Sequence, residues 1–175
     1  MESDDGTNRL TREFVLALTA NMERIAVDQR SLVIAGNDKF FSAGAELSEI
    51  AALDGPSAYE FSKMGQGLMD TIDQFPAPVY AAVSGYCMGG GLDLVLACHR
   101  RIASSHALFG HRGAALGLMT GWGGTQRLPR LIGKGHALAL FAAAEKITAA
   151  HALQMGLVDV IAQDPVEAAV RELQT

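Results

Sequence analysis

The chain has 175 residues, of which 49% are hydrophobic and 19% are charged. That length suits a single domain over residues 1–175 with a real core, and the composition argues against intrinsic disorder. The formal net charge of −5, without a lysine or arginine cluster, argues against a nucleic-acid partner. Because no uncharged apolar run approaches about 20 residues, the sequence predicts no membrane span and no membrane partner.

The N-terminal segment and the cysteines bear on compartment and cofactors. Residues 1–8 are polar and acidic and resemble neither a signal peptide nor a transit peptide, so we expect a cytoplasmic protein. Cys87 and Cys98 form neither a disulfide framework nor a C-x-x-C site, and we expect both as small core residues. No cluster of histidine, cysteine and acidic residues has metal-ligand spacing, so we predict no metal and no permanently bound cofactor.

The first half of the chain predicts helices and strands in alternation. Apolar residues three or four positions apart predict an amphipathic first helix, and Ser57 with Glu60 has the spacing of a capping box for a later one. In order, the expected elements are a helix over 8–27, a strand over 31–36, a loop over 36–44, a short helix over 46–53, a helix from the capping box to about 73, and a strand over 78–85.

The second half continues in the same way. In order, we expect a short apolar helix over 90–98, strands over 100–105 and 107–110, helices over 123–131 and 135–143, a short helix between Thr148 and Gly156, a strand over 157–162, and a final helix starting at Asp164-Pro165. Alternating strands and helices without a repeat of fixed period predict the α/β class.

A glycine triplet, 89–91, joins a buried strand to the start of a helix. Free N–H groups at a helix start carry partial positive charge, and glycines let a ligand oxygen approach the backbone. Such a turn suits a phosphate or a developing oxyanion, but it also suits simple close packing of a helix on a strand. Neither the dinucleotide motif G-x-G-x-x-G nor G-x-x-x-x-G-K-[ST] fits, which argues against NAD and ATP.

Two further elements gain meaning beside the triplet. The small residues of the loop 41–47 allow a second backbone donor, and two such N–H groups together form an oxyanion hole. Asp93 lies in the first turn of the helix that follows the triplet. Its carboxylate either stabilises the helix dipole or faces the oxyanion site as an acid or base.

Four ordered segments resemble motifs of the enoyl-CoA hydratase/isomerase (crotonase) family. They are FSAGAEL at 41–47, PVYAAVSGYCMGGGLDLVLACHRRIA at 78–103, FGHRGAALGLMTGWGGTQRLPRLIGKGHAL at 109–138 and ITAAHALQMGLVDVI at 147–161. The resemblance implies a crotonase-like spiral of ββα units, shortened at the N-terminal strands and the C-terminal helices. It also implies an acyl-CoA substrate, with coenzyme A bound only as part of that substrate, and a homotrimer or hexamer.

The resemblance also implies roles for single residues. The backbone N–H groups of Ala45 and Gly90 match the oxyanion-hole donors, and Asp93 matches the first catalytic glutamate. Coenzyme A contacts match Lys39 and the backbone of three loop residues, Ala43, Ala45 and Leu47. The second catalytic glutamate of the hydratases is replaced by Gly113, so the resemblance implies isomerase-like proton transfer rather than two-glutamate hydration.

Several alternatives stay open. His111 is either a residue of a polar loop or an assistant to Asp93, because an imidazole titrates near neutrality. Arg112 is either a surface residue or a ligand for a carboxylated acyl chain, as a decarboxylase would need. We interpret Trp122 as a packing residue. A decarboxylase, a thioester hydrolase and a degenerate acyl-CoA-binding protein therefore remain alternatives to an isomerase or hydratase.

Overall fold

The computed structural model describes residues 1–174 and shows strands and helices in alternation. The strands are Arg9–Leu10 (β1), Leu32–Ala35 (β2), Phe40–Ser42 (β3), Gly44–Ala45 (β4), Val79–Val83 (β5), Tyr86–Met88 (β6), Arg100–Ala103 (β7), Leu108–Gly110 (β8), Lys146–Thr148 (β9) and Val160–Ile161 (β10). They form a parallel sheet in the order β10-β7-β5-β2, a mixed sheet in the order β3-β6-β8-β9, and a short parallel pair, β1 with β4.

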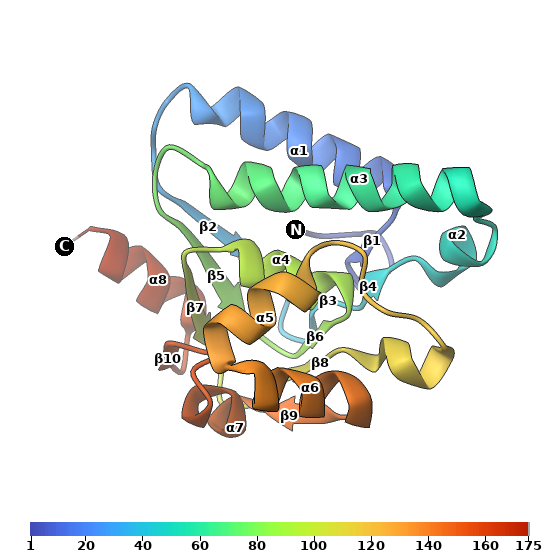
Figure 1. The fold of residues 1–175 in the computed structure, drawn as a ribbon. Coiled ribbons are helices and arrows are strands. Elements are labelled where there is room, and N and C mark those ends of the chain that lie inside the picture. The colour runs from blue at the N-terminus through green and yellow to red at the C-terminus, as the bar shows by residue number, and fades with distance from the viewer. Residues whose placement is uncertain (175) are drawn as a thin grey trace.

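The helices cover these sheets and enclose the core. They are Arg12–Ala26 (α1), Leu47–Ala51 (α2), Gly55–Asp73 (α3), Gly90–Ala97 (α4), Gly124–Ile132 (α5), Lys134–Ala143 (α6), Ala149–Gln154 (α7) and Pro165–Leu173 (α8), with a 3-10 helix at Arg112–Leu116 (η1). Figure 1 shows α1 (blue) and α3 (green) side by side, with α5 and α6 (orange) on the other side of α4. Every residue of α4 is buried, so this helix forms the centre of the core.

The chain repeats one path three times. It runs through a strand of the parallel sheet, turns, continues as a strand of the mixed sheet, and then enters a helix: β2-β3-α2, β5-β6-α4 and β7-β8-η1. At the β5–β6 turn the φ of Gly85 is +60°, and a side chain there would meet the backbone of Lys39. This path is the spiral of ββα units expected from the sequence, and the α/β class is confirmed.

The structure corrects two helix starts and adds elements that the sequence did not indicate. The first helix, expected over 8–27, begins at Arg12, because Arg9–Leu10 pairs with β4 as a strand. The capping box at Ser57 and Glu60 is wrong: Asp54 is the N-cap of α3, and Ser57 is its reciprocal partner. The Asp54 carboxylate accepts the Ser57 N–H, and the Ser57 hydroxyl accepts the Asp54 N–H, so the N–H groups of both residues are satisfied. The loop expected over 36–44 contains β3 and the first residue of β4, and β1, β6, β9 and η1 were not predicted either.

Two glycines of α3 predict opposite effects on stability. A Cβ at Gly65 would overlap the Trp122 ring, whereas a Cβ at exposed Gly67 would meet nothing within 4 Å. We expect Gly65→Ala to lower the free energy of unfolding by about 1–3 kcal/mol through overpacking. Gly67→Ala should raise it by roughly 0.5–1 kcal/mol, because alanine restricts the unfolded chain. Urea unfolding of both variants checks this pair, and equal effects would contradict the packing seen here.

Both cysteines are buried and neither forms a disulfide, as expected for core residues. Burial raises the pKa of the Cys98 thiol to about 12 and that of Cys87 well above its ordinary value. Because the native state favours the neutral thiols, their burial makes the free energy of unfolding depend on pH. The contribution of the thiols to that free energy is complete below about pH 9 and is lost as the pH rises toward 12. At about pH 8 we expect no reaction of native protein with a thiol reagent, and reaction of both thiols after unfolding. Rapid labelling of native protein would contradict this burial.

Candidate active site

The glycine triplet forms the turn between β6 and α4. Gly89 has φ +50° and ψ −118°, a conformation that residues with a side chain rarely adopt, and its N–H donates to the Gly110 carbonyl at 2.9 Å. Helix α4 starts at Gly90, so the N–H groups of its first turn have no acceptor within the helix. The sequence therefore builds a buried helix start whose donors are accessible to a ligand oxygen.

A second loop lies directly against this helix start. Gly44 has φ +98°, and a Cβ placed on it would lie 3.4 Å from the Gly90 nitrogen. A Cβ on Gly90 would lie 3.3 Å from the Ala45 nitrogen. The Ala45 and Gly90 nitrogens thus border the same narrow space. Glycine at positions 44 and 90 keeps that space open.

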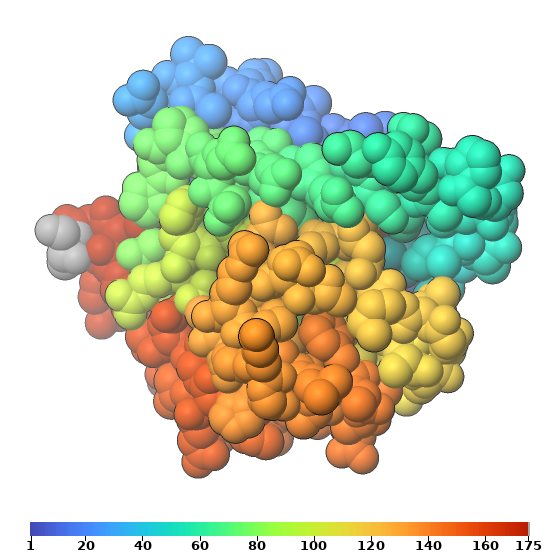
Figure 2. All heavy atoms as spheres, in the orientation of Figure 1, coloured from blue at the N-terminus to red at the C-terminus, as the bar shows by residue number. Residues whose placement is uncertain are grey.

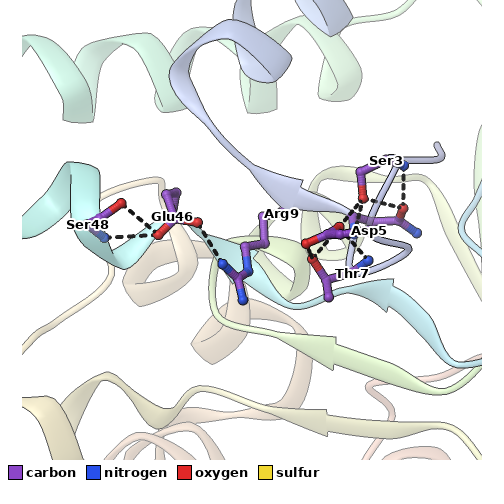
Figure 3. A network of polar contacts seen from close by, with 7 residues as sticks. Ser3, Asp5, Thr7, Arg9, Glu46 and Ser48 are labelled. Atoms are coloured by element: carbon purple, nitrogen blue, oxygen red, sulfur yellow. Dashed lines mark hydrogen bonds and ion pairs between the residues drawn. The ribbon is translucent and has the colours of Figure 1, made fainter.

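The N-terminal segment contacts the loop that carries Gly44 and Ala45 (Figure 3). Strand β1 pairs with β4, and Arg9 forms an ion pair with Glu46 at 3.0 Å. Glu46 is the N-cap of α2: its carboxylate accepts the N–H and the hydroxyl of Ser48. These hydrogen bonds, followed by the one from Arg9, hold the pKa of Glu46 below its ordinary value. The charged Glu46 therefore ties the loop to both β1 and α2.

Asp93, in the first turn of α4, is 2% exposed. Its Oδ2 accepts a hydrogen bond from the Thr120 hydroxyl. That hydroxyl in turn accepts a hydrogen bond from the backbone N–H of Trp122 at 3.3 Å. Within residues 1–174 its Oδ1 has no hydrogen-bond partner. A Cβ at Gly124 would overlap this same oxygen, so glycine at the start of α5 leaves room for the carboxylate. Thr120 thus fixes Oδ2, whereas Oδ1 can accept a proton.

His111 follows β8 and lies beside Asp93. It lies in the loop between β8 and η1, as one of the two interpretations had it, but it is buried there, with 6% of its surface exposed. Its Nε2 lies 3.8 Å from Asp93 Oδ1, and its ring contacts the Phe141 ring edge-on at 5.3 Å between centroids. The end of β8 therefore brings an imidazole to the free oxygen of Asp93.

These groups line one cleft of about 550 Å³, a volume typical of small-molecule sites. In Figure 2 the cyan region that holds α2 lies above the yellow segment 111–120, and the cleft lies between them. Its mouth carries apolar side chains from both sides, namely Leu47, Ile50, Leu53, Leu116, Leu118 and Met119. A polar floor under an apolar mouth suits an acyl group with one reactive polar end.

A larger cleft of about 780 Å³ lies between α3 and α5. Its lining contains neither of the two N–H loops and not Asp93. It is polar, and an ion pair of 2.8 Å between Arg127 and Asp70 lies along it. The smaller cleft is therefore the candidate active site.

The structure brings most of the predicted site residues together. Ala43, Ala45, Leu47, Gly90, Asp93, His111 and Arg112 all line the cleft. Arg112 is exposed at its rim, in agreement with a surface position. Lys39 is exposed and does not line the cleft, and its Nζ lies 5.8 Å from the centroid of the Phe40 ring.

Gly113 also lines the cleft, but its surroundings leave no room for a side chain. A Cβ there would lie 2.7 Å from the Leu118 carbonyl oxygen, and the Leu118 N–H donates to the Gly113 carbonyl at 2.9 Å. The backbone is thus closed around the position that the family resemblance assigns to the second glutamate. Replacing glycine by glutamate would require this turn to move.

Thr120 and Gly124 are site residues that sequence reasoning missed. Thr120 is separated from Asp93 by 27 positions, and no local spacing connects the two. Trp122 was expected to pack, and it does: it is 3% exposed, its Nε1 donates to the Phe61 carbonyl, and its ring lies where a Cβ of Gly90 would be. Trp122 therefore holds the helix start in place from the side of α3.

Comparison with known proteins agrees with this geometry. The family model described as enoyl-CoA hydratase/isomerase matches residues 1–175. The chain belongs to the enoyl-CoA hydratase/isomerase family. It is 40% identical over 163 residues to a probable enoyl-CoA hydratase of Bacillus subtilis, covering 91% of this chain and 63% of the relative. It is 41% identical over 161 residues to a crotonyl-CoA hydratase of Syntrophomonas wolfei, covering 89% and 61%.

Solved structures of this family share the fold. The crystal structure of an enoyl-CoA hydratase from Bacillus anthracis superposes with a TM-score of 0.91 at 33% identity, over 98% of this chain and 69% of that one. The chain spans somewhat less than two thirds of the length of the two curated relatives above. The crotonase fold expected from the motifs is therefore confirmed.

Among the residues that the structure describes, no group of three or more histidine, cysteine or acidic side chains is arranged to hold a metal ion. No helix within residues 1–174 combines the length and the apolar character needed to cross a membrane.

Proposed function

We propose that this chain binds an acyl-CoA thioester and stabilises its enolate, with Asp93 as the base. The observation that carries the proposal is the free Oδ1 of Asp93, buried in the same cleft as the Ala45 and Gly90 nitrogens. A carboxylate beside two convergent backbone donors can remove a proton next to a carbonyl whose oxygen those donors hold. The relatives named as hydratases support this general chemistry.

The chemistry assigns a role to each group. The thioester oxygen lies between the two N–H groups, which stabilise negative charge as it develops there; one such donor contributes about 2.7–4 kcal/mol in other enzymes. Asp93 takes the proton from the acyl α-carbon, and the electron pair moves to the thioester oxygen. Because Thr120 fixes the other carboxylate oxygen, Oδ1 is held toward the substrate without reorganisation.

We further propose double-bond isomerisation in preference to hydration. Hydration by two carboxylates requires a second carboxylate to activate water, and the closed turn at Gly113 has no space for a side chain that carries one. Moving a double bond requires only removal of a proton and its delivery two carbons away. The apolar mouth of the cleft, with Leu116 and Met119 exposed, fits an unsaturated acyl chain.

The coenzyme A part of the substrate has a natural place along the first loop. The backbone of Ala43, Ala45 and Leu47 lines the cleft, and we propose that it contacts the nucleotide end, with Lys39 meeting a phosphate. Coenzyme A enters only with the substrate. A homo-oligomer, trimeric or hexameric, is part of the proposal because the family resemblance implies one.

A comparison of two substrates tests the choice of reaction. The protein is offered a 3-enoyl-CoA, which only an isomerase converts to the conjugated thioester, and a 2-enoyl-CoA, which only a hydratase converts to the hydroxyacyl thioester. We expect isomerisation to exceed hydration by at least about 10²-fold, the usual contribution of one general acid or base. Efficient hydration without isomerisation would contradict the proposal.

A further inference from the structure

Two buried polar atoms in the cleft face each other without a hydrogen bond. Asp93 Oδ1 and His111 Nε2 are both inaccessible, and neither has a partner within the part of the chain that the structure describes. They lie 3.8 Å apart, which is longer than a hydrogen bond. An unsatisfied buried polar group is destabilising and uncommon in folded proteins, so two of them side by side point to a function.

The surrounding contacts hold both atoms in this orientation. Asp93 is fixed through its other oxygen by Thr120, and the His111 ring is held edge-on against Phe141 of α6. The Gly113 backbone lies on the other side of the imidazole, where a Cβ would be 3.5 Å from Nδ1, an ordinary contact distance. These contacts leave Oδ1 and Nε2 facing each other in the wall of the cleft that both residues line. Catalytic hydrogen bonds are often long before the substrate binds.

We propose that Asp93 and His111 form a two-residue acid–base pair in which Asp93 removes the α-proton and His111 protonates the γ-carbon. The pair rests on the proposed isomerase function and replaces the second carboxylate that Gly113 excludes. It differs from a shuttle in which Asp93 alone removes and returns one proton. His111 is then a catalytic residue, because it touches the reacting carbon.

The steps balance as follows. The proposed cycle starts with Asp93 unprotonated and with a proton on His111 Nε2. Asp93 takes the proton of the acyl α-carbon, the C–H electron pair moves to the thioester oxygen, and a dienolate forms between Ala45 and Gly90. The dienolate collapses, the double bond moves into conjugation, and a new C–H bond forms at the γ-carbon with the Nε2 proton of His111. Asp93 then passes its proton across the short gap to His111, which restores both groups.

The origin of the γ-proton separates this pair from a one-residue shuttle. Enzyme is equilibrated in deuterium oxide, so that His111 carries deuterium, and is mixed in excess with a protiated 3-enoyl-CoA for a single turnover. The pair predicts solvent deuterium at the γ-carbon of the product, read by mass spectrometry and NMR. A shuttle through Asp93 alone predicts that the γ-carbon receives the original α-hydrogen, and that result would overturn the pair.

Two variants sharpen the test. His111→Gln fills similar space but cannot deliver a proton, so isomerisation should fall by at least about 10²-fold, and the residual product should carry less solvent deuterium at the γ-carbon than the wild-type product. His136→Gln, at an exposed position of α6, is the matched control and should behave as wild type. In His111→Ala, added imidazoles should restore the rate in proportion to their basicity, which filling of space alone would not do. An unchanged isomerisation rate in His111→Gln would contradict the pair.

Exchange of the α-hydrogens of a saturated acyl-CoA separates failure of the pair from failure of the function. Exchange requires Asp93 and the oxyanion hole but no γ-protonation, so we expect His111→Gln to retain it. Exchange without solvent deuterium at the γ-carbon would overturn the pair and leave the proposed function standing. Absence of exchange in the wild type, with the thioester bound, would overturn both.

Discussion

Asp93→Asn should lower the kcat for 3-enoyl-CoA isomerisation by about 10²–10⁴-fold while leaving the affinity for the thioester nearly unchanged. Asparagine is almost isosteric with aspartate and can still pair with Thr120 through its side-chain oxygen, but it cannot accept a proton from carbon. Because the oxyanion donors are backbone groups of Ala45 and Gly90, they remain in place. The loss should therefore appear in turnover and not in binding.

Two measurements make this prediction sharp. Isothermal titration with a saturated acyl-CoA gives the affinity of both proteins, and a coupled assay gives kcat. If Asp93→Asn turns over at the wild-type rate, Asp93 is not the base. If Asp93→Asn loses affinity for the thioester to the same extent as turnover, the carboxylate shapes the cleft and does not act as the base.

Gly124→Ala should reduce activity by at least about 10²-fold although it removes no chemical group. The added methyl overlaps Asp93 Oδ1 and would lie 2.9 Å from Cγ2 of Thr120. The carboxylate must then turn away from the substrate, and a displacement of about 1 Å in a catalytic group can cost this much. Gly124 has an ordinary helical backbone conformation, so alanine is tolerated by the backbone of α5.

The matched control for this variant is Gly135→Ala in α6. A Cβ at Gly135 meets nothing within 4 Å, so activity should be unchanged and stability equal or slightly higher. Kinetics and thermal unfolding of the two variants are measured together. Full activity in Gly124→Ala would show that the carboxylate need not occupy the position seen here.

The elements that the sequence predicted well are those set by local patterns. The glycine triplet, the small-residue loop and Asp93 could be found because helix starts and tight turns depend on neighbouring residues. The start of α3 was assigned wrongly because serine can occupy either end of a capping box. Only the structure shows that Asp54 is the N-cap and Ser57 its partner. The strand Lys146–Thr148 is short and pairs antiparallel with β8, a contact that local sequence does not specify.

The parts of the site that stayed hidden depend on contacts between distant segments. Thr120 orients Asp93 from a glycine-rich loop whose path is fixed by Trp122 packing on α3. His111 looked like a loop residue because charged and small neighbours follow it, yet Phe141 of α6 covers it. Such pairings arise from tertiary packing, and no periodicity along the chain carries them.

The measurement that tests the central claim most directly is hydrogen exchange at the α-carbon of butanoyl-CoA in deuterium oxide, followed by NMR. It requires only the base and the oxyanion hole, and it does not depend on the natural acyl chain. We predict exchange that depends on the wild-type protein and disappears in Asp93→Asn. Binding of the thioester without any exchange would contradict enolate chemistry and would favour an acyl-CoA-binding role for this cleft.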